Sequence, residues 1–144
     1  RTLCHRYLIV RSAWVYGIGR DFVSTVLNAA ADPTCPWLAV PTDRFASPTS
    51  ADDLTAAVEQ LIDHDTLGIY HIVCQGRCSR YDFAQAILKA AHMEDKLELH
   101  PIRAADAGST PSYTVLDNLM LRLDNLPQPR PWKEALNEYI NSLQ

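Results

Sequence analysis

Two adjacent carboxylates, Asp52 and Asp53, are the most direct candidates for acid–base chemistry in this 144-residue sequence. A general acid and a general base must reach the same reacting atom, so their side chains have to point together. These two residues follow Ser50 and precede apolar residues at helical spacing, which predicts the first turn of a helix. Consecutive helical residues point about 100° apart, and first-turn acids stabilise the helix dipole. We therefore interpret both carboxylates as helix-capping groups.

Cysteine and histidine, the common metal ligands, are too scattered to predict a site. The sequence contains no Cys-x-x-Cys pair, and a predicted turn at Gly76 separates Cys74 from Cys78. His71 lies within an apolar run, where a core position is expected. No Gly-x-Ser-x-Gly motif of serine hydrolases is present. We expect no metal site, and we expect four free, partly buried thiols: Cys4, Cys35, Cys74 and Cys78.

The composition is that of a globular domain with a modest acidic excess. The net charge is −4, with 13 Lys and Arg against 17 Asp and Glu, and no basic cluster. Nucleic acids and anionic membranes require a basic surface, so neither is an expected partner. No apolar run approaches the roughly 20 residues of a membrane-spanning helix. We expect one domain and a cytoplasmic location.

Four helices are predicted from the spacing of apolar residues. Pro33 ends the first helix, and Ser50 and Ser79 each precede an Asp by three positions, as in a capping box. Pro131 is placed at the first position of the last helix. The predicted helices cover residues 21–31, 50–63, 79–91 and 131 onward, with short helical material around 117–123.

Two buried strands are predicted, at residues 7–17 and 69–73. The first strand ends in a loop at its carboxyl end, which is where ligands bind in open α/β sheets. Residues 37–40 and 97–102 are expected to be extended, and 103–113 is expected to be a loop. Two strands make no stable sheet alone. We therefore expect a small α+β unit with exposed edges, a homodimer, or a partner that supplies a missing half.

Five segments, in order, resemble dTDP-4-dehydrorhamnose reductases, which are extended short-chain dehydrogenases. The first, Leu8–Gly17, is similar to the strand and loop that follow the catalytic helix of that family. The others are Asp43–Thr49, Gly68–Ile72, Ser79–Ala84 and Pro131–Leu136. The resemblance implies an α/β fold class: the C-terminal portion of an extended short-chain dehydrogenase (Rossmann-like) fold, with two parallel-type strands and an α+β substrate-binding lobe. It also implies that residues 1–144 form a single domain lacking the N-terminal dinucleotide-binding half.

The reactive groups of that family are not found in this sequence. Gly17-Ile18-Gly19 lacks the third glycine of a dinucleotide-binding turn, and no Tyr-x-x-x-Lys pair occurs. The resemblance therefore implies NADPH or NADH as cofactor of the intact enzyme, and no cofactor for this chain alone. We expect no catalytic residue here and no turnover by the isolated chain.

The resemblance implies five substrate-binding residues: Trp14, Arg44, Phe45, Pro48 and Thr49. An aromatic face such as that of Trp14 suits the C–H surface of a pyranose, although a core position at a strand end remains open. Arg44 either grips a diphosphate with its forked guanidinium or is a solvated loop residue. Pro48 and Thr49 are also expected to shape the turn and cap the next helix.

Two further residues near Trp14 are assigned to structure instead of binding. We expect Tyr16 to pack in the core and Arg11 to be a buried arginine paired with an acid; a polar floor to the site is the alternative for Arg11.

Several positions depart from the family pattern. Arg44 stands where the family usually has Gln, and Ala46 stands where it has Gly. Thr110, before Pro111, replaces a frequent Arg, and Asp21 replaces Asn. Two of these departures change the charge where a sugar diphosphate would lie. A different nucleotide sugar, or a relative without activity, therefore remains open.

The expected function is substrate binding within an NAD(P)H-dependent reductase that converts dTDP-4-dehydro-6-deoxy-L-mannose to dTDP-L-rhamnose. The alternatives are another extended short-chain epimerase or dehydratase acting on a nucleotide sugar, and a non-catalytic regulatory protein on the same fold. The expected partners are the dTDP-sugar and the missing N-terminal half, and a homodimer with a second copy of the chain is an open alternative.

Overall fold

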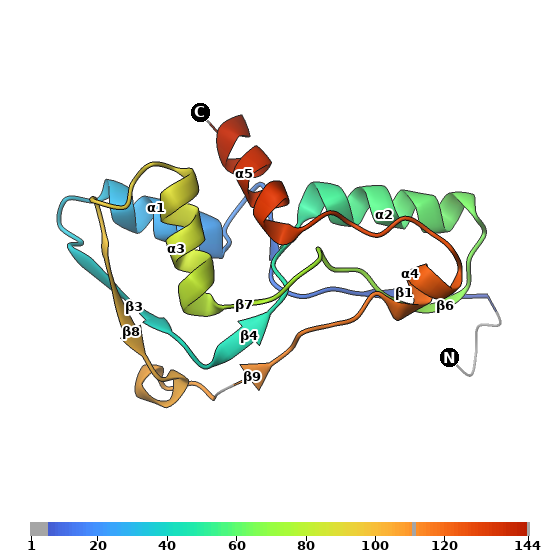
Figure 1. Ribbon diagram of the computed structural model, residues 1–144, viewed down its shortest axis with the longest axis horizontal. Coiled ribbons are helices and arrows are strands. Elements are labelled where there is room, and N and C mark those ends of the chain that lie inside the picture. The colour runs from blue at the N-terminus through green and yellow to red at the C-terminus, as the bar shows by residue number, and fades with distance from the viewer. Residues whose placement is uncertain (1–5, 111, 144) are drawn as a thin grey trace.

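The computed structural model describes residues 6–110 and 112–143 as an elongated α/β unit (Figure 1). The expectations for Cys4 and Pro111 lie outside these residues. A parallel strand pair with two helices occupies one end, and a larger assembly of three helices and a second parallel pair occupies the other. Short strands connect the two ends.

The predicted parallel pair is confirmed. β1 (Leu8–Arg11) pairs in parallel with β6 (Gly68–His71), with Ile9 opposite Ile69. One face of this pair packs with α2 (Ala51–Asp63) and the short α4 (Leu119–Leu123). The core of this end consists of Ala57, Leu61, Tyr70, Ile72, Leu121 and Leu126.

The first predicted strand is divided in the structure. β1 ends at Arg11, and a separate strand, β2 (Val15–Tyr16), pairs in parallel with β5 (Thr49–Ser50). Trp14 turns the chain between them with a φ of 43°, and its carbonyl accepts a hydrogen bond of 3.3 Å from the Thr49 amide.

Burial of β1 on both faces, and with it burial of Arg11, was a wrong prediction. Ile9 is 38% exposed and Arg11 is exposed. A two-stranded sheet with helices on one face leaves its other face open, so alternate residues of β1 reach solvent. His71, at the end of β6, is half-buried for the same reason, although a core position was expected.

The larger end is built from α1 (Phe22–Ala31), α3 (Arg80–Ala90) and α5 (Trp132–Ser142). These helices pack with a second parallel pair, β3 (Trp37–Pro41) and β8 (Glu98–Ile102). Buried residues of this core include Tyr16, Val23, Val26, Val40, Phe83, Ile87, Leu88, Trp132, Leu136 and Ile140.

A three-stranded sheet lies between the two ends. Its central strand, β4 (Arg44–Ala46), is antiparallel to β7 (Cys78–Ser79) and parallel to β9 (Ser112–Tyr113). The predicted loop at 103–113 was partly wrong, since regular structure forms on both sides of the undescribed residue 111: a 3-10 turn at Ala104–Ala107 and strand β9. Strands of two or three residues are too short to show the alternation that predicts a strand.

The helix starts follow the capping residues found in the sequence. Ser50 and Ser79 are N-caps that accept hydrogen bonds from the amides of Asp53 and Asp82, and Ser79 with Asp82 forms a full capping box. Pro131 is the N-cap residue of α5 and not its first helical residue, because its ψ of 138° is extended. Within the described ranges, no helix has the length and apolarity to span a membrane.

Candidate functional site

Trp14 occupies a strained position after the carboxyl end of β1. Its φ of 43° lies in the left-handed region, which costs a bulky residue of the order of 1–3 kcal/mol. The half-buried indole stacks at 6.3 Å from the ring of Phe83. Backbone strain of this kind is retained where the surrounding structure imposes it, and it often accompanies a functional residue.

Arg80 covers one face of the Trp14 ring. The guanidinium carbon of this first residue of α3 lies 3.8 Å from the Trp14 ring centroid and 4.4 Å from that of Phe22. Because Arg80 covers one face of the indole, a sugar that stacks on Trp14 would have to use the remaining surface of the ring. Arg80 was not predicted from the sequence, because a charged residue at the start of a helix is expected to face solvent.

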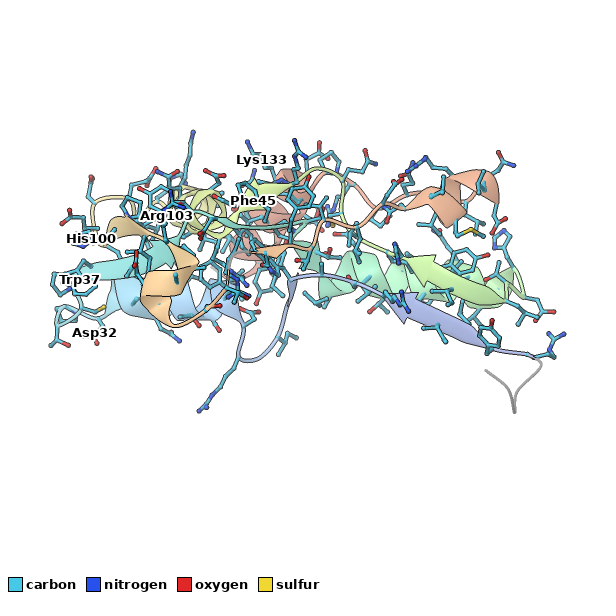
Figure 2. All side chains as sticks on the ribbon, turned by 90° about the horizontal axis from the view of Figure 1, so that it is seen from below. Asp32, Trp37, Phe45, His100, Arg103 and Lys133 are labelled. Atoms are coloured by element: carbon cyan, nitrogen blue, oxygen red, sulfur yellow. The ribbon has the colours of Figure 1, made fainter. Side chains whose placement is uncertain are left out.

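Arg44 and Phe45 lie together on β4. The Arg44 Nε donates a hydrogen bond of 3.4 Å to Ser112 Oγ on β9, and the Arg44 side chain is half-buried. The Phe45 ring lies 6.0 Å from that of Tyr113. Arg77 donates a hydrogen bond to the Tyr113 hydroxyl and places its guanidinium 5.7 Å from that ring. Figure 2 shows Phe45 near the middle of the molecule, away from the end that carries Trp37 and His100.

Pro48 and Thr49 are both buried. The Thr49 hydroxyl donates 3.1 Å to the Ser47 carbonyl and accepts 3.2 Å from the Cys74 amide. With no exposed surface, Thr49 holds the β5 turn together. The structure thus brings Arg44 and Phe45 together on β4 and leaves Thr49 inside; substrate contact by Pro48 and Thr49 stays a prediction.

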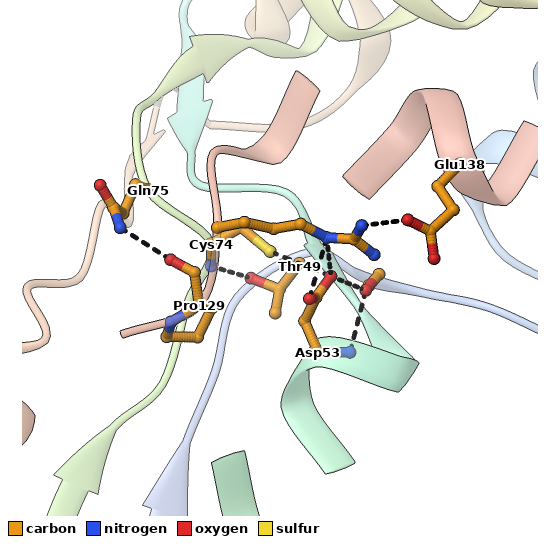
Figure 3. Close-up of polar contacts among 8 residues, drawn as sticks. Thr49, Asp53, Cys74, Gln75, Pro129 and Glu138 are labelled. Atoms are coloured by element: carbon orange, nitrogen blue, oxygen red, sulfur yellow. Dashed lines mark hydrogen bonds and ion pairs between the residues drawn. The ribbon is translucent and has the colours of Figure 1, made fainter. Parts of the chain in front are cut away.

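Asp53 takes part in an ion-pair network that the sequence did not predict (Figure 3). Its carboxylate lies 3.0 Å from Arg130 Nε, and the same guanidinium hydrogen-bonds Glu138 on α5. The Cys74 thiol lies 3.8 Å from Asp53 Oδ2. Asp52 and Asp53 lie in the first turn of α2 as predicted, but the capping group is the Ser50 hydroxyl, which accepts from the Asp53 amide and donates to the Asp53 carboxylate. The Asp53 carboxylate also ties α2 to α5 through Arg130, 77 positions away, which no local pattern reveals.

Cys74, Cys78 and Tyr16 are held in their neutral forms by burial. Burial raises the pKa of Cys74 to about 11 and that of Cys78 to about 12, so both remain thiols near neutral pH. Burial also raises the pKa of Tyr16, which packs in the core as expected. Among the described residues, no group of His, Cys, Asp and Glu is arranged to hold a metal ion.

A groove of about 290 Å³ lies beyond the carboxyl end of β6. Its walls come from the segment after β6 and from the stretch before α4, where Asn118 exchanges two hydrogen bonds with the backbone of Val73. Arg77 lies in its wall and also contacts Tyr113. The groove is therefore joined by direct contacts to the sheet that carries Arg44 and Phe45.

The described residues do not fit a dinucleotide. The one glycine pair that follows a strand, Gly17 and Gly19, leads into α1, whose N-terminus is already occupied by the Asp21 carboxylate. That carboxylate accepts from the amides of Gly17 at 2.8 Å and Ser24 at 2.7 Å. A pyrophosphate at this helix end would lose these amides and face a negative charge.

The sequence profile of the RmlD substrate-binding domain matches residues 1–144. The chain belongs to that family. This domain is the substrate-binding part of a nucleotide-sugar reductase family, and the predicted resemblance is confirmed.

Related proteins agree with the assignment to the RmlD family. The spore coat polysaccharide biosynthesis protein SpsK of Bacillus subtilis is 38% identical over 92% of this chain and 46% of its own length. The dTDP-4-dehydrorhamnose reductase of Mycolicibacterium smegmatis is 35% identical over 92% of this chain and 41% of its own length. The chain thus spans less than half the length of these two relatives.

Solved structures of the family superpose closely on this RmlD domain. A dTDP-4-dehydrorhamnose reductase from Clostridium acetobutylicum gives a TM-score of 0.89 at 39% identity, covering 96% of this chain and 49% of its own. The Bacillus anthracis enzyme, solved with NADP, gives 0.91 at 30% identity, covering 99% and 50%. The predicted fold class, part of an extended short-chain dehydrogenase, is confirmed.

More distant members of the fold include an epimerase and a dehydratase. A Thermus thermophilus UDP-glucose 4-epimerase gives a TM-score of 0.70 at 15% identity, and a Bacillus anthracis dTDP-glucose 4,6-dehydratase gives 0.69 at 12%. At these identities the likeness is one of fold alone. The alternative of an epimerase or dehydratase is therefore not favoured.

Proposed function

We propose that this chain binds a dTDP-4-dehydro-6-deoxy sugar within an NAD(P)H-dependent reductase that forms dTDP-L-rhamnose. The observation that carries the proposal is the RmlD match over the whole chain together with the placement of Trp14. This strained aromatic residue follows the carboxyl end of β1, next to Arg80, in the region where open α/β sheets bind ligands.

The division of labour in this proposal follows from the side chains. Trp14 supplies an aromatic surface for the sugar, and nearby arginines offer N–H groups to the diphosphate. NAD(P)H supplies the hydride when bound, and the residues that hold it belong to a dinucleotide-binding half outside this chain. The chain's own residues bind and orient the substrate and exclude water from it.

Two proteins test this function: the full-length protein that contains this chain, and the 144-residue chain alone. With dTDP-4-dehydro-L-rhamnose, the full-length protein is expected to oxidise NADPH or NADH and form dTDP-L-rhamnose, and the chain alone is expected to do neither. Reduction of a UDP-sugar in preference to the dTDP-sugar would reject the substrate assignment. Steady NADPH consumption by the chain alone would reject the division of labour.

A further inference from the structure

We propose that Arg80 and Arg44 together form the anion-binding element of this domain and receive the diphosphate of the nucleotide sugar. This inference rests on the proposed function and names a residue, Arg80, that was not among the predicted binding residues.

The two arginines flank the paired strands β4 and β7. In the antiparallel register of β4 and β7, Phe45 is opposite Ser79 and Ala46 is opposite Cys78. Arg44 comes directly before Phe45, and Arg80, the first residue of α3, comes directly after Ser79. Two like charges held near one another repel. The repulsion is felt at Arg80, since the Arg44 charge and, more strongly, burial lower the pKa of Arg80 to about 10.

The repulsion is not relieved by an acidic neighbour. Within residues 6–110 and 112–143, the ion pairs involve Arg6, Arg122, Arg130 and His100, and neither Arg44 nor Arg80 is among them. Arg130, the one other half-buried Lys or Arg among the described residues, contacts both Asp53 and Glu138. Two adjacent cations without a carboxylate are suited to a dianionic ligand.

The aromatic neighbours hold the Arg80 guanidinium while leaving its N–H groups free to bind. Trp14 and Phe22 contact the guanidinium through their ring faces, at 3.8 and 4.4 Å. Stacking uses the face of the group, so the donors in its plane remain available for phosphate oxygens. Among the described residues, the Arg80 side chain makes no hydrogen bond. The Arg44 side chain uses only its Nε as a donor, in a long hydrogen bond of 3.4 Å to Ser112 Oγ.

The stacking of Arg80 on Trp14 also links the diphosphate site to the sugar site. Trp14 packs against Arg80 on one ring face and lies at the edge of the core near Phe83. A nucleotide sugar whose diphosphate binds Arg80 and Arg44 would place its hexose beside the exposed part of Trp14. Arg80 therefore positions the ligand for the residue expected to recognise the sugar.

The test measures binding to the full-length protein by calorimetry with dTDP, UDP, thymidine and inorganic pyrophosphate. Arg80→Gln is expected to weaken dTDP and pyrophosphate binding at least about 10-fold and to change thymidine binding less than about twofold, as expected for the loss of a charge-assisted hydrogen bond. Arg6→Gln, just before β1, removes the same charge from an exposed pair with Asp65 and is expected to leave all four affinities unchanged.

Each other outcome is decisive. Equal dTDP affinity of Arg80→Gln and the unchanged protein would overturn the role of Arg80 and leave the proposed function standing. Arg80-dependent binding of UDP without binding of dTDP would reject the thymidine nucleotide and keep the anion site. Failure to bind either nucleoside diphosphate would overturn both. Should Arg80→Gln fail to fold, Arg80→Lys keeps the charge without the fork, and its dTDP affinity is expected to fall several-fold.

Discussion

The Tyr139 hydroxyl donates a hydrogen bond of 2.5 Å to the Gly17 carbonyl, across 122 positions of sequence. Tyr139 lies on α5, and its ring packs 5.4 Å from that of Tyr16 on β2. Gly17 in turn has no room for a side chain, since a Cβ there would lie 2.8 Å from the Cβ of Ala51. The last helix and the start of α2 thus fix the loop that follows Trp14.

Removing the Tyr139 hydroxyl is expected to loosen this loop. Tyr139→Phe should lower the free energy of unfolding by about 1 kcal/mol, since one hydrogen bond is lost and the carbonyl stays partly buried. Tyr81→Phe is the matched control because the Tyr81 hydroxyl makes only a 3.5 Å contact to the Leu99 carbonyl. The measurement is the thermal unfolding of both variants. Equal losses of stability would show that the hydrogen bond to Gly17 makes no contribution of its own.

Because Thr49 is fully buried, its effect on stability is expected to exceed its effect on dTDP binding. Thr49→Val keeps the shape but leaves the Cys74 amide without its acceptor, so the free energy of unfolding should fall by about 1–3 kcal/mol. Thr55→Val, on the exposed face of α2, should cost less. In the full-length protein, dTDP affinity measured well below the unfolding temperature should stay within about threefold. A large loss of affinity with unchanged stability would assign Thr49 to binding.

The Arg130–Glu138 contact predicts a pH dependence of stability. Arg130 lowers the pKa of Glu138 below its ordinary value of 4.5. A carboxyl with a lowered pKa in the folded state contributes stability above its ordinary pKa, and this contribution is lost as the pH falls through the folded-state pKa. The unfolding temperature of Glu138→Gln should therefore lie below that of the unchanged protein at about pH 7, and the difference should close towards about pH 3. A difference independent of pH would contradict the ion pair.

The cysteines are expected to differ in reactivity. Burial keeps Cys74 and Cys78 protonated, whereas Cys35 is only half-buried, with its thiol 3.5 Å from the Trp37 carbonyl. With iodoacetamide near pH 8, peptide mass spectrometry should find Cys35 modified first, and Cys74 and Cys78 modified only after unfolding. Modification of Cys74 at the rate of Cys35 would show that the core around Asp53 opens readily.

Local sequence features predicted the helices well. Ser50 and Ser79 mark helix starts because a hydroxyl that accepts from an amide three positions later is a local interaction. Asp21 caps α1 in the same way. Apolar spacing then gives the buried face of each helix, as with Phe83 and Ile87 on α3.

Features that depend on distant segments were not predictable. The break at Trp14 is held by the Thr49 amide, and the Asp53–Arg130 pair joins residues 77 positions apart. Arg80 acquires its role only because Trp14 and Phe22 are brought to it by other elements. In each case the partner residue is brought close by tertiary packing, which hydrophobic periodicity cannot predict.

The central claim is that the surface around Trp14 binds an activated hexose. The most direct measurement compares the affinity of dTDP-L-rhamnose for Trp14→Ala and Trp37→Ala in the full-length protein. Trp37 is a matched control because it is 52% exposed on β3, where it stacks on His100 at the far end of the molecule (Figure 2). With both variants folded by circular dichroism, Trp14→Ala should bind at least about 10-fold more weakly and Trp37→Ala should bind as before. Equal affinity in both variants would contradict the account and assign Trp14 to packing.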